Sequence, residues 1–206
     1  MIWKLYYLYS SMINIVPLHI LAGIYPSTAL RDGTPEISMH GNARALTIRD
    51  LVQHRSLAWQ ELPSIKIDKQ LLINCLQAND IVMPSRGERY PARHFTQTSV
   101  PVFPLGYMNL IRTQADIDPR YLTWYLNRAS TQAMITGLLK GTNIKALNKS
   151  SLIELPVAVP SLELQRKIAL LDGTSRRAIE IRNRINDLET EEIEHLTESL
   201  MKSEEQ

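Results

Sequence analysis

The segment from residue 141 to residue 171 constrains the fold most, because the chain changes there from one kind of structure to another. Residues 155–160 predict a short extended strand bounded by two prolines, which suits the edge of a sheet. Ser161 then offers a hydroxyl to cap a helix, and Glu163 lies in the first turn of that helix. We therefore expect a folded body ahead of this junction and a long helix behind it.

The predicted helix carries an apolar series at steps of three and four residues, as a packed seam requires. Its members are Leu164, Ile168, Leu171, Ala178, Ile181, Ile185, Leu188 and, after a slip of one residue, Leu196. The slip argues against a perfect coiled coil. The face either packs on its own body or pairs with a second copy or a partner. Roughly forty helical residues at about 1.5 Å each would overrun a small domain, which favours pairing.

Charge divides the chain into two unequal parts. Residues 1–186 hold 22 Lys and Arg against 13 Asp and Glu, whereas residues 187–206 hold one Lys against eight acids. A basic body indicates a polyanionic partner such as DNA. The acidic end reads as a solvated helix face or a frayed tail.

We expect three regions: a non-essential extension at residues 1–12, a body at 13–160, and a helix with an acidic tail at 161–206. The apolar start is interrupted by polar residues and Pro17, which argues against a signal peptide or a membrane span. Cys75 is the only cysteine, so no internal disulfide forms and a cytoplasmic location is expected. The histidines are scattered without zinc spacing, and we expect no metal or cofactor.

The body reads as α+β with many short strands. Strands are expected near residues 13–20, 45–48, 62–68, 81–83, 100–103 and 107–112, and helices at 49–53, from Asp118-Pro119 onward, and at 130–139. Residues 77–80 have turn chemistry, with Asn79 able to adopt a left-handed conformation.

Signatures of catalysis are mostly missing from the sequence. It contains no nucleophile elbow, no phosphate-binding P-loop and no glycine fingerprint for a dinucleotide. The loop that methylates DNA bases, Asn/Asp-Pro-Pro-aromatic, does not occur either. Asp80 and Glu88 form a weak candidate for the metal site of a nuclease. The simpler interpretations are that Asp80 stabilises a turn and that Glu88 is a solvated loop residue. We expect a chain that does no chemistry itself.

Two cationic loops are the candidate DNA-binding sites. The first contains Ser85, Arg86, Arg89, Tyr90, Arg93 and His94, and the second contains Lys140, Asn143 and Lys145. Arginine can donate two hydrogen bonds to guanine or grip a phosphate, and loop residues are displayed when strands hold both ends of the loop. The plain alternatives are a solubilising loop and a simple connection between elements.

Three segments resemble the specificity subunits of type I restriction-modification systems. Residues 76–87, LQANDIVMPSRG, are similar to that family's element of leucine, two residues, Gly-Asp-Ile, an apolar residue, serine and Arg-Gly, with Asn79 in place of the glycine. Residues 117–127 look like its helix opening, and residues 141–169 look like its exit into a spacer helix. The resemblance would make residues 69–76 extended.

The resemblance implies a mixed α/β target recognition domain that reads a DNA half-site, and a helix that docks a methyltransferase. Full-length members carry two such domains and two helical regions, whereas this chain shows one of each. We therefore expect double-stranded DNA, a DNA-adenine methyltransferase subunit and a restriction subunit as partners, and a homodimer or a pair with a second specificity chain. A truncated or orphan recognition module is the alternative. The family's recognition loops vary, so the DNA-binding residues rest on charge and loop placement alone.

Overall fold

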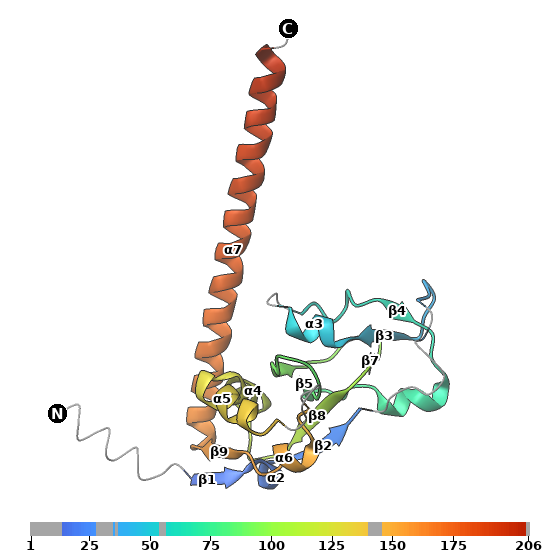
Figure 1. Cartoon of the computed structure of the whole chain (residues 1–206), viewed down its shortest axis with the longest axis vertical. Coiled ribbons are helices and arrows are strands. Elements are labelled where there is room, and N and C mark those ends of the chain that lie inside the picture. The colour runs from blue at the N-terminus through green and yellow to red at the C-terminus, as the bar shows by residue number, and fades with distance from the viewer. Residues whose placement is uncertain (1–13, 28–34, 36, 54–56, 140–145, 205–206) are drawn as a thin grey trace, which may run out of the picture. The chain divides into compact units, whose positions relative to one another are not determined.

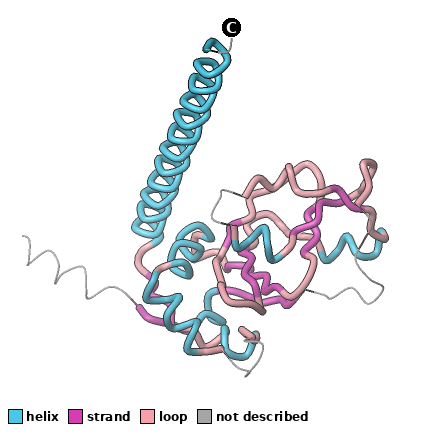
Figure 2. The backbone as a smooth tube through the Cα atoms, turned by 45° about the horizontal axis from the view of Figure 1, so that its top comes forward, coloured by secondary structure: helices cyan, strands magenta, loops and turns pink. Residues whose placement is uncertain are grey.

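The computed structural model describes residues 14–27, 35, 37–53, 57–139 and 146–204 of the 206. It confirms an α+β body of short strands followed by one long helix (Figures 1 and 2). The elements are β1 (Asn14–Pro17), α2 (Leu18–Leu21), β2 (Ala22–Pro26), β3 (Ala43–Leu46), α3 (Ile48–Val52), β4 (Ser64–Ile65), η1 (Lys69–Asn74), β5 (Ile81–Pro84), β6 (Arg93–His94), β7 (Val102–Pro104), β8 (Met108–Thr113), α4 (Pro119–Asn127), α5 (Ala129–Gly137), α6 (Lys149–Leu152), β9 (Pro156–Val159) and α7 (Leu162–Glu204).

The central sheet is antiparallel, with the strand order β2-β8-β5-β6. All four residues of β5 are buried, because both faces of the strand are covered. Ile81 and Met83 pack into the core cluster beneath α4 and α5, and Val82 packs into a second cluster beside α3. The alternation places successive side chains on opposite faces, as a strand requires. A residue that follows β5 therefore starts from a fixed position.

A second, three-stranded sheet has the order β4-β3-β7, with β3 and β7 parallel. Its core contains Ala45, Ile65 and Phe103. Leu71 and Leu72 of η1 pack against this cluster, so residues 69–74 wind into a 3₁₀ helix. The expectation of an extended segment at 69–76 is therefore wrong over most of its length.

The third sheet consists of β1 and β9, and β1 has no other strand partner among the described residues, so the sheet brings β1 beside the strand that precedes α7. Its proline-bounded strand agrees with the edge strand expected at residues 155–160. The strand expected at 13–20, however, is broken after Pro17. Leu18 and Leu21 are both buried, and three-residue spacing brings them to one side only in a helical turn.

Local signals at the turns and helix starts are confirmed. Asn79 has a φ of 70°, in the left-handed region. The Asp118 carboxylate accepts a hydrogen bond from the Arg120 backbone N–H (2.8 Å), with Pro119 at the first helical position. The Ser161 hydroxyl likewise accepts from the Leu164 N–H at the start of α7 (3.4 Å).

The chain divides into two compact units, one ending at Ala169 and the other beginning at Leu170. We call the first the body and the second the helical unit. The first turns of α7 thus belong to the body, where Ala169 is buried and Ile168 packs against the core. No helix in the described ranges is long and apolar enough to cross a membrane.

Candidate nucleic-acid interface

The first cationic loop begins where β5 leaves the central sheet. Ser85 is half-buried, and Arg86, Gly87, Glu88 and Arg89 are exposed. Gly87 has a φ of +120°, and a Cβ built there would meet no other atom. The glycine is therefore required by the backbone conformation and not by lack of space. The loop displays its first two arginines, as expected.

The structure brings the two cationic loops together. The Leu147 N–H donates to the Ser85 carbonyl oxygen (2.9 Å), and Arg86 forms a β-bridge with Ala146. Lys140, Asn143 and Lys145 lie outside the described residues, but the described end of their loop is fixed beside Arg86. Pairing between segments sixty residues apart has no signal in the sequence.

Arg86 makes a second contact that the sequence does not reveal. Its guanidinium carbon lies 3.7 Å from the centre of the Tyr107 ring, which is a close cation–π distance. The Tyr107 side chain is 47 % exposed. An arginine and an aromatic ring therefore meet at the surface beside the joined loops.

Tyr90 is not displayed, which contradicts the expectation for this residue. Its side chain is 2 % exposed, and its hydroxyl donates to the Gly87 carbonyl oxygen (2.8 Å). Burial raises the pKa of the phenol. The Gln132 amide of α5 also donates to the Tyr90 carbonyl oxygen (3.0 Å). Tyr90 belongs to the core cluster, and its hydrogen bond to Gly87 fixes the backbone of the loop to that cluster.

Arg93 and His94 turn to opposite sides of the body. Arg93 Nε donates to the Leu51 carbonyl oxygen (3.0 Å), and its terminal nitrogen donates to that of Gln53. The guanidinium therefore holds the last carbonyls of α3. Both residues are half-buried instead of displayed.

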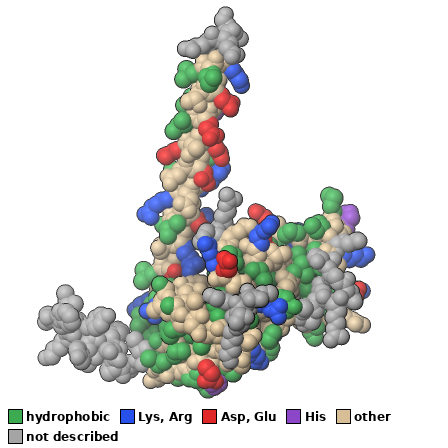
Figure 3. All heavy atoms as spheres, viewed as in Figure 1, with side chains coloured by type: hydrophobic (Ala, Val, Ile, Leu, Met, Phe, Trp, Pro, Cys, Tyr) green, Lys and Arg blue, Asp and Glu red, His purple; other side chains and the backbone are tan. Residues whose placement is uncertain are grey.

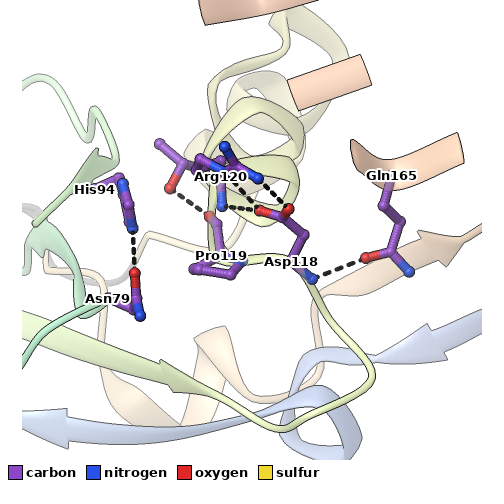
Figure 4. A network of polar contacts seen from close by, with 7 residues as sticks. Asn79, His94, Asp118, Pro119, Arg120 and Gln165 are labelled. Atoms are coloured by element: carbon purple, nitrogen blue, oxygen red, sulfur yellow. Dashed lines mark hydrogen bonds and ion pairs between the residues drawn. The ribbon is translucent and has the colours of Figure 1, made fainter. Parts of the chain in front are cut away.

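Figure 4 shows His94 beside the start of α4. Its Nε2 lies 3.1 Å from Asn79 Oδ1. Burial lowers the pKa of His94, the Arg120 guanidinium lowers it further, and the Asp118 carboxylate acts in the opposite direction. His94 thus contacts Asn79 and lies within the electrostatic influence of Asp118 and Arg120.

The carboxylates of the weak nuclease candidate do not form a pair. Asp80 is buried at the start of β5, and Glu88 is exposed on the loop beyond its end. The four residues of β5, which span about 13 Å of extended chain, lie between them in the sequence. Asp80 forms an ion pair with Arg112 (2.9 Å) and accepts from the Gln77 N–H (2.8 Å), so it serves the turn. No group of three or more metal-ligating side chains occurs among the described residues.

Gln165 is an important residue that the sequence did not single out. Its side chain is 1 % exposed, and its Oε1 accepts from the Asp118 N–H (2.9 Å). Its Nε2 donates to the carbonyl oxygens of Pro160 (2.9 Å) and Asp116 (3.3 Å). One amide therefore fixes the first turn of α7 to the start of α4 (Figure 4).

The predicted partner-binding side chains fall into two groups. Ile168 packs against the core of the body, and Leu164 is half-buried. Ala178 is half-buried, and the larger members of the helical unit are 47 to 70 % exposed: Leu171, Ile181, Ile185, Leu188 and Leu196. Figure 3 shows hydrophobic side chains among acidic ones along the second half of α7. The helical unit therefore keeps an apolar series on its surface.

Comparisons with known proteins relate the fold to one group of structures. The HsdS subunit from Thermoanaerobacter tengcongensis matches 82 % of this chain and 39 % of its own, with a TM-score of 0.57 and 15 % identity. The type I restriction-modification S subunit from M. genitalium matches 77 % and 37 %, with a TM-score of 0.51 and 16 % identity. A chain from a structure concerning complex assembly and conformational transition of the type I R-M system matches 82 % and 40 %, with a TM-score of 0.58 and 13 % identity.

At these identities the likeness establishes the fold. This chain has the fold of part of a type I HsdS subunit and spans about 40 % of the length of the structures it matches. No protein-family model and no curated protein sequence matches the chain.

Proposed function

We propose that this chain is a sequence-specific DNA-binding specificity subunit of a type I-like restriction-modification system. It does no chemistry itself and directs a DNA-adenine methyltransferase subunit, with a restriction subunit as a further partner, to its target. The likeness to HsdS subunits over most of the chain carries the proposal. The exposed Arg86 and Arg89 on a loop anchored to the sheet support it, because such a loop can reach into DNA.

The proposal includes a half-size form, in which one recognition body and one helix need a second half. The exposed apolar series on α7 supports pairing of the helical unit with another copy of the chain or with a second specificity chain. Two copies related by a twofold axis would present two identical reading surfaces, and the target would be an interrupted palindrome.

Charge on the helical unit favours an antiparallel pair of helices. Residues 170–186 contain four arginines and two acids, whereas residues 187–202 contain six acids and one lysine. Antiparallel pairing sets the arginine-rich half of one copy beside the acid-rich half of the other, and parallel pairing sets like beside like. Charges that flank an apolar seam choose the orientation in this way.

The decisive experiment is expression of the full chain with a DNA-adenine methyltransferase encoded by an adjacent gene. Co-purification and sequencing of methylated sites follow. We expect a complex and methylation at one interrupted palindrome. The methyltransferase expressed alone is the control and should leave that site unmodified. A methylated site that is asymmetric or uninterrupted would refute the homodimer, and no sequence preference at all would refute the specificity role.

The alternative function is a truncated or orphan recognition module, which the 40 % coverage of HsdS chains keeps open. Such a module would bind DNA without forming an active modification complex. The co-purification distinguishes the two, because an orphan module would bind DNA and leave the methyltransferase in the unbound fraction.

A further inference from the structure

Arg86 and Tyr107 extend from the ends of two paired strands. Pro84 of β5 is paired with Met108 of β8, and the ladder continues by one bond, from the Ser85 N–H to the Tyr107 carbonyl oxygen (2.9 Å). Arg86 comes directly after this bond. The contact between its guanidinium and the Tyr107 ring is thus set by strand register.

The platform under this pair is fixed on both sides. The Leu147 N–H holds the Ser85 carbonyl oxygen from the second loop. On the other strand, the Ser27 hydroxyl accepts from the Met108 N–H (2.9 Å) and donates to the Gly106 carbonyl oxygen. An arginine built on such supports loses little side-chain freedom when it binds a ligand.

Other guanidiniums of the body are engaged differently. Arg112 donates to Asp80 and Arg120 donates to Asp118. Arg86 has no carboxylate partner in the part of the chain that the structure describes, and its guanidinium lies against a ring face instead. Stacking covers one face of the guanidinium and leaves the N–H groups at its edge available.

We infer that Arg86 reads a guanine of the DNA half-site, through two hydrogen bonds to O6 and N7 in the major groove, and that Tyr107 is the positioning residue that fixes its plane. This inference rests on the proposed function. Guanine presents two acceptors in one plane, so a planar donor that is already oriented binds it more strongly than a mobile one does. A phosphate accepts from many directions, and a mobile lysine serves it well.

The test compares methylated sites and DNA binding for the full complex carrying Arg86→Lys, Arg86→Ala, Tyr107→Leu or Tyr107→Phe. Arg86→Lys keeps the charge and removes the planar fork. We expect it to relax the preference for one G·C pair in each half-site and to weaken binding to the parent site about ten- to a hundredfold, with little change in salt dependence. Tyr107→Leu should relax the preference for the same G·C pair to a smaller degree. Tyr107→Phe should keep that preference because the ring remains.

Arg128→Lys is the matched control, because that guanidinium also stacks on a ring, Trp124 at 5.2 Å, at the junction of α4 and α5. It should leave the methylated site unchanged. Arg86→Ala that weakens binding equally on all sequences and lowers the salt slope would identify a phosphate contact and overturn the inference. Variants that keep the parent preference at every position would also overturn it, while the proposed function would stand. A parent complex without any sequence preference would overturn both.

Discussion

The Asp80 carboxylate holds the Arg112 guanidinium by two hydrogen bonds, to Nε at 2.9 Å and to a terminal nitrogen at 3.3 Å. The same carboxylate caps the turn before β5 through the Gln77 N–H. Arg112 also lies over the Tyr25 ring (4.9 Å). The pair thus joins the start of β5 to β8 and β2 within the sheet from which the first cationic loop leaves.

Asp80→Ala should destabilise the body by about 3 kcal/mol, because it leaves the Arg112 charge without its partner and the Gln77 N–H without an acceptor. Urea unfolding followed by circular dichroism measures this change. Glu163→Ala is the control, since its ion pair with Lys167 is exposed on α7, and its midpoint should match the parent. Equal midpoints for both variants would show that the Asp80 pair does not stabilise the sheet.

Gln165→Ala should cost about 2 kcal/mol in the free energy of unfolding. It leaves the Asp118 N–H and the Pro160 carbonyl oxygen buried without partners. Arg166→Ala, at an exposed position one residue further on, should change little. Chemical denaturation of both variants checks the expectation, and a Gln165→Ala protein as stable as Arg166→Ala would contradict it.

Lowering the pH from 7.5 to 5.5 should reduce stability in part through His94. The folded-state pKa lies below the ordinary value, so the unfolded chain binds the proton more readily as the pH falls through that ordinary value. The stability that the neutral His94 contributes is complete above the ordinary pKa. It is lost as the pH falls from that value through the folded-state pKa. His94→Gln removes this titration and should flatten the pH dependence of the urea midpoint. A variant with the same pH dependence as the parent would exclude His94 as the source.

Glutamate at Ile181, Ile185 and Leu188 together should abolish pairing through α7. These side chains are about half exposed in the single chain, so charge there disrupts an interface and leaves the body folded. Sedimentation velocity should show a change from dimer to monomer. Asn183→Glu, on the same turns but outside the series, is the control and should remain dimeric.

Arg89→Ala should weaken DNA binding and reduce the slope of log K against log salt by about 0.9, if the guanidinium neutralises one phosphate. The measurement is a salt titration of the complex by fluorescence anisotropy. Arg177→Ala, which removes an equal charge from α7, should keep the parent slope. An unchanged slope for Arg89→Ala would exclude a phosphate contact at this residue.

Sequence reasoning succeeded where a local rule decides the structure. The left-handed turn at Asn79 and the helix starts at Asp118 and Ser161 follow from side-chain chemistry within a few residues. The positions of β5, β7 and β8 along the chain followed in the same way, because short apolar runs between turns suffice to place them.

Sequence reasoning failed where contacts between distant segments of the chain determine the structure. Tyr90 looks like a loop residue until the core cluster that covers it is assembled. The Arg86–Tyr107 contact depends on the register of β5 with β8, and the function of Gln165 depends on the position of α4. No pattern within one segment contains this information.

The pairing of β1 with β9 has a topological consequence. Asn14 is the register partner of Val159, so β1 lies beside the strand that leads into α7, about 4.8 Å away. A domain with adjacent entry and exit can be inserted into another chain, repeated in tandem or circularly permuted without threading or stretching the backbone. The small two-stranded sheet therefore suits this body to insertion into, or repetition within, a longer chain.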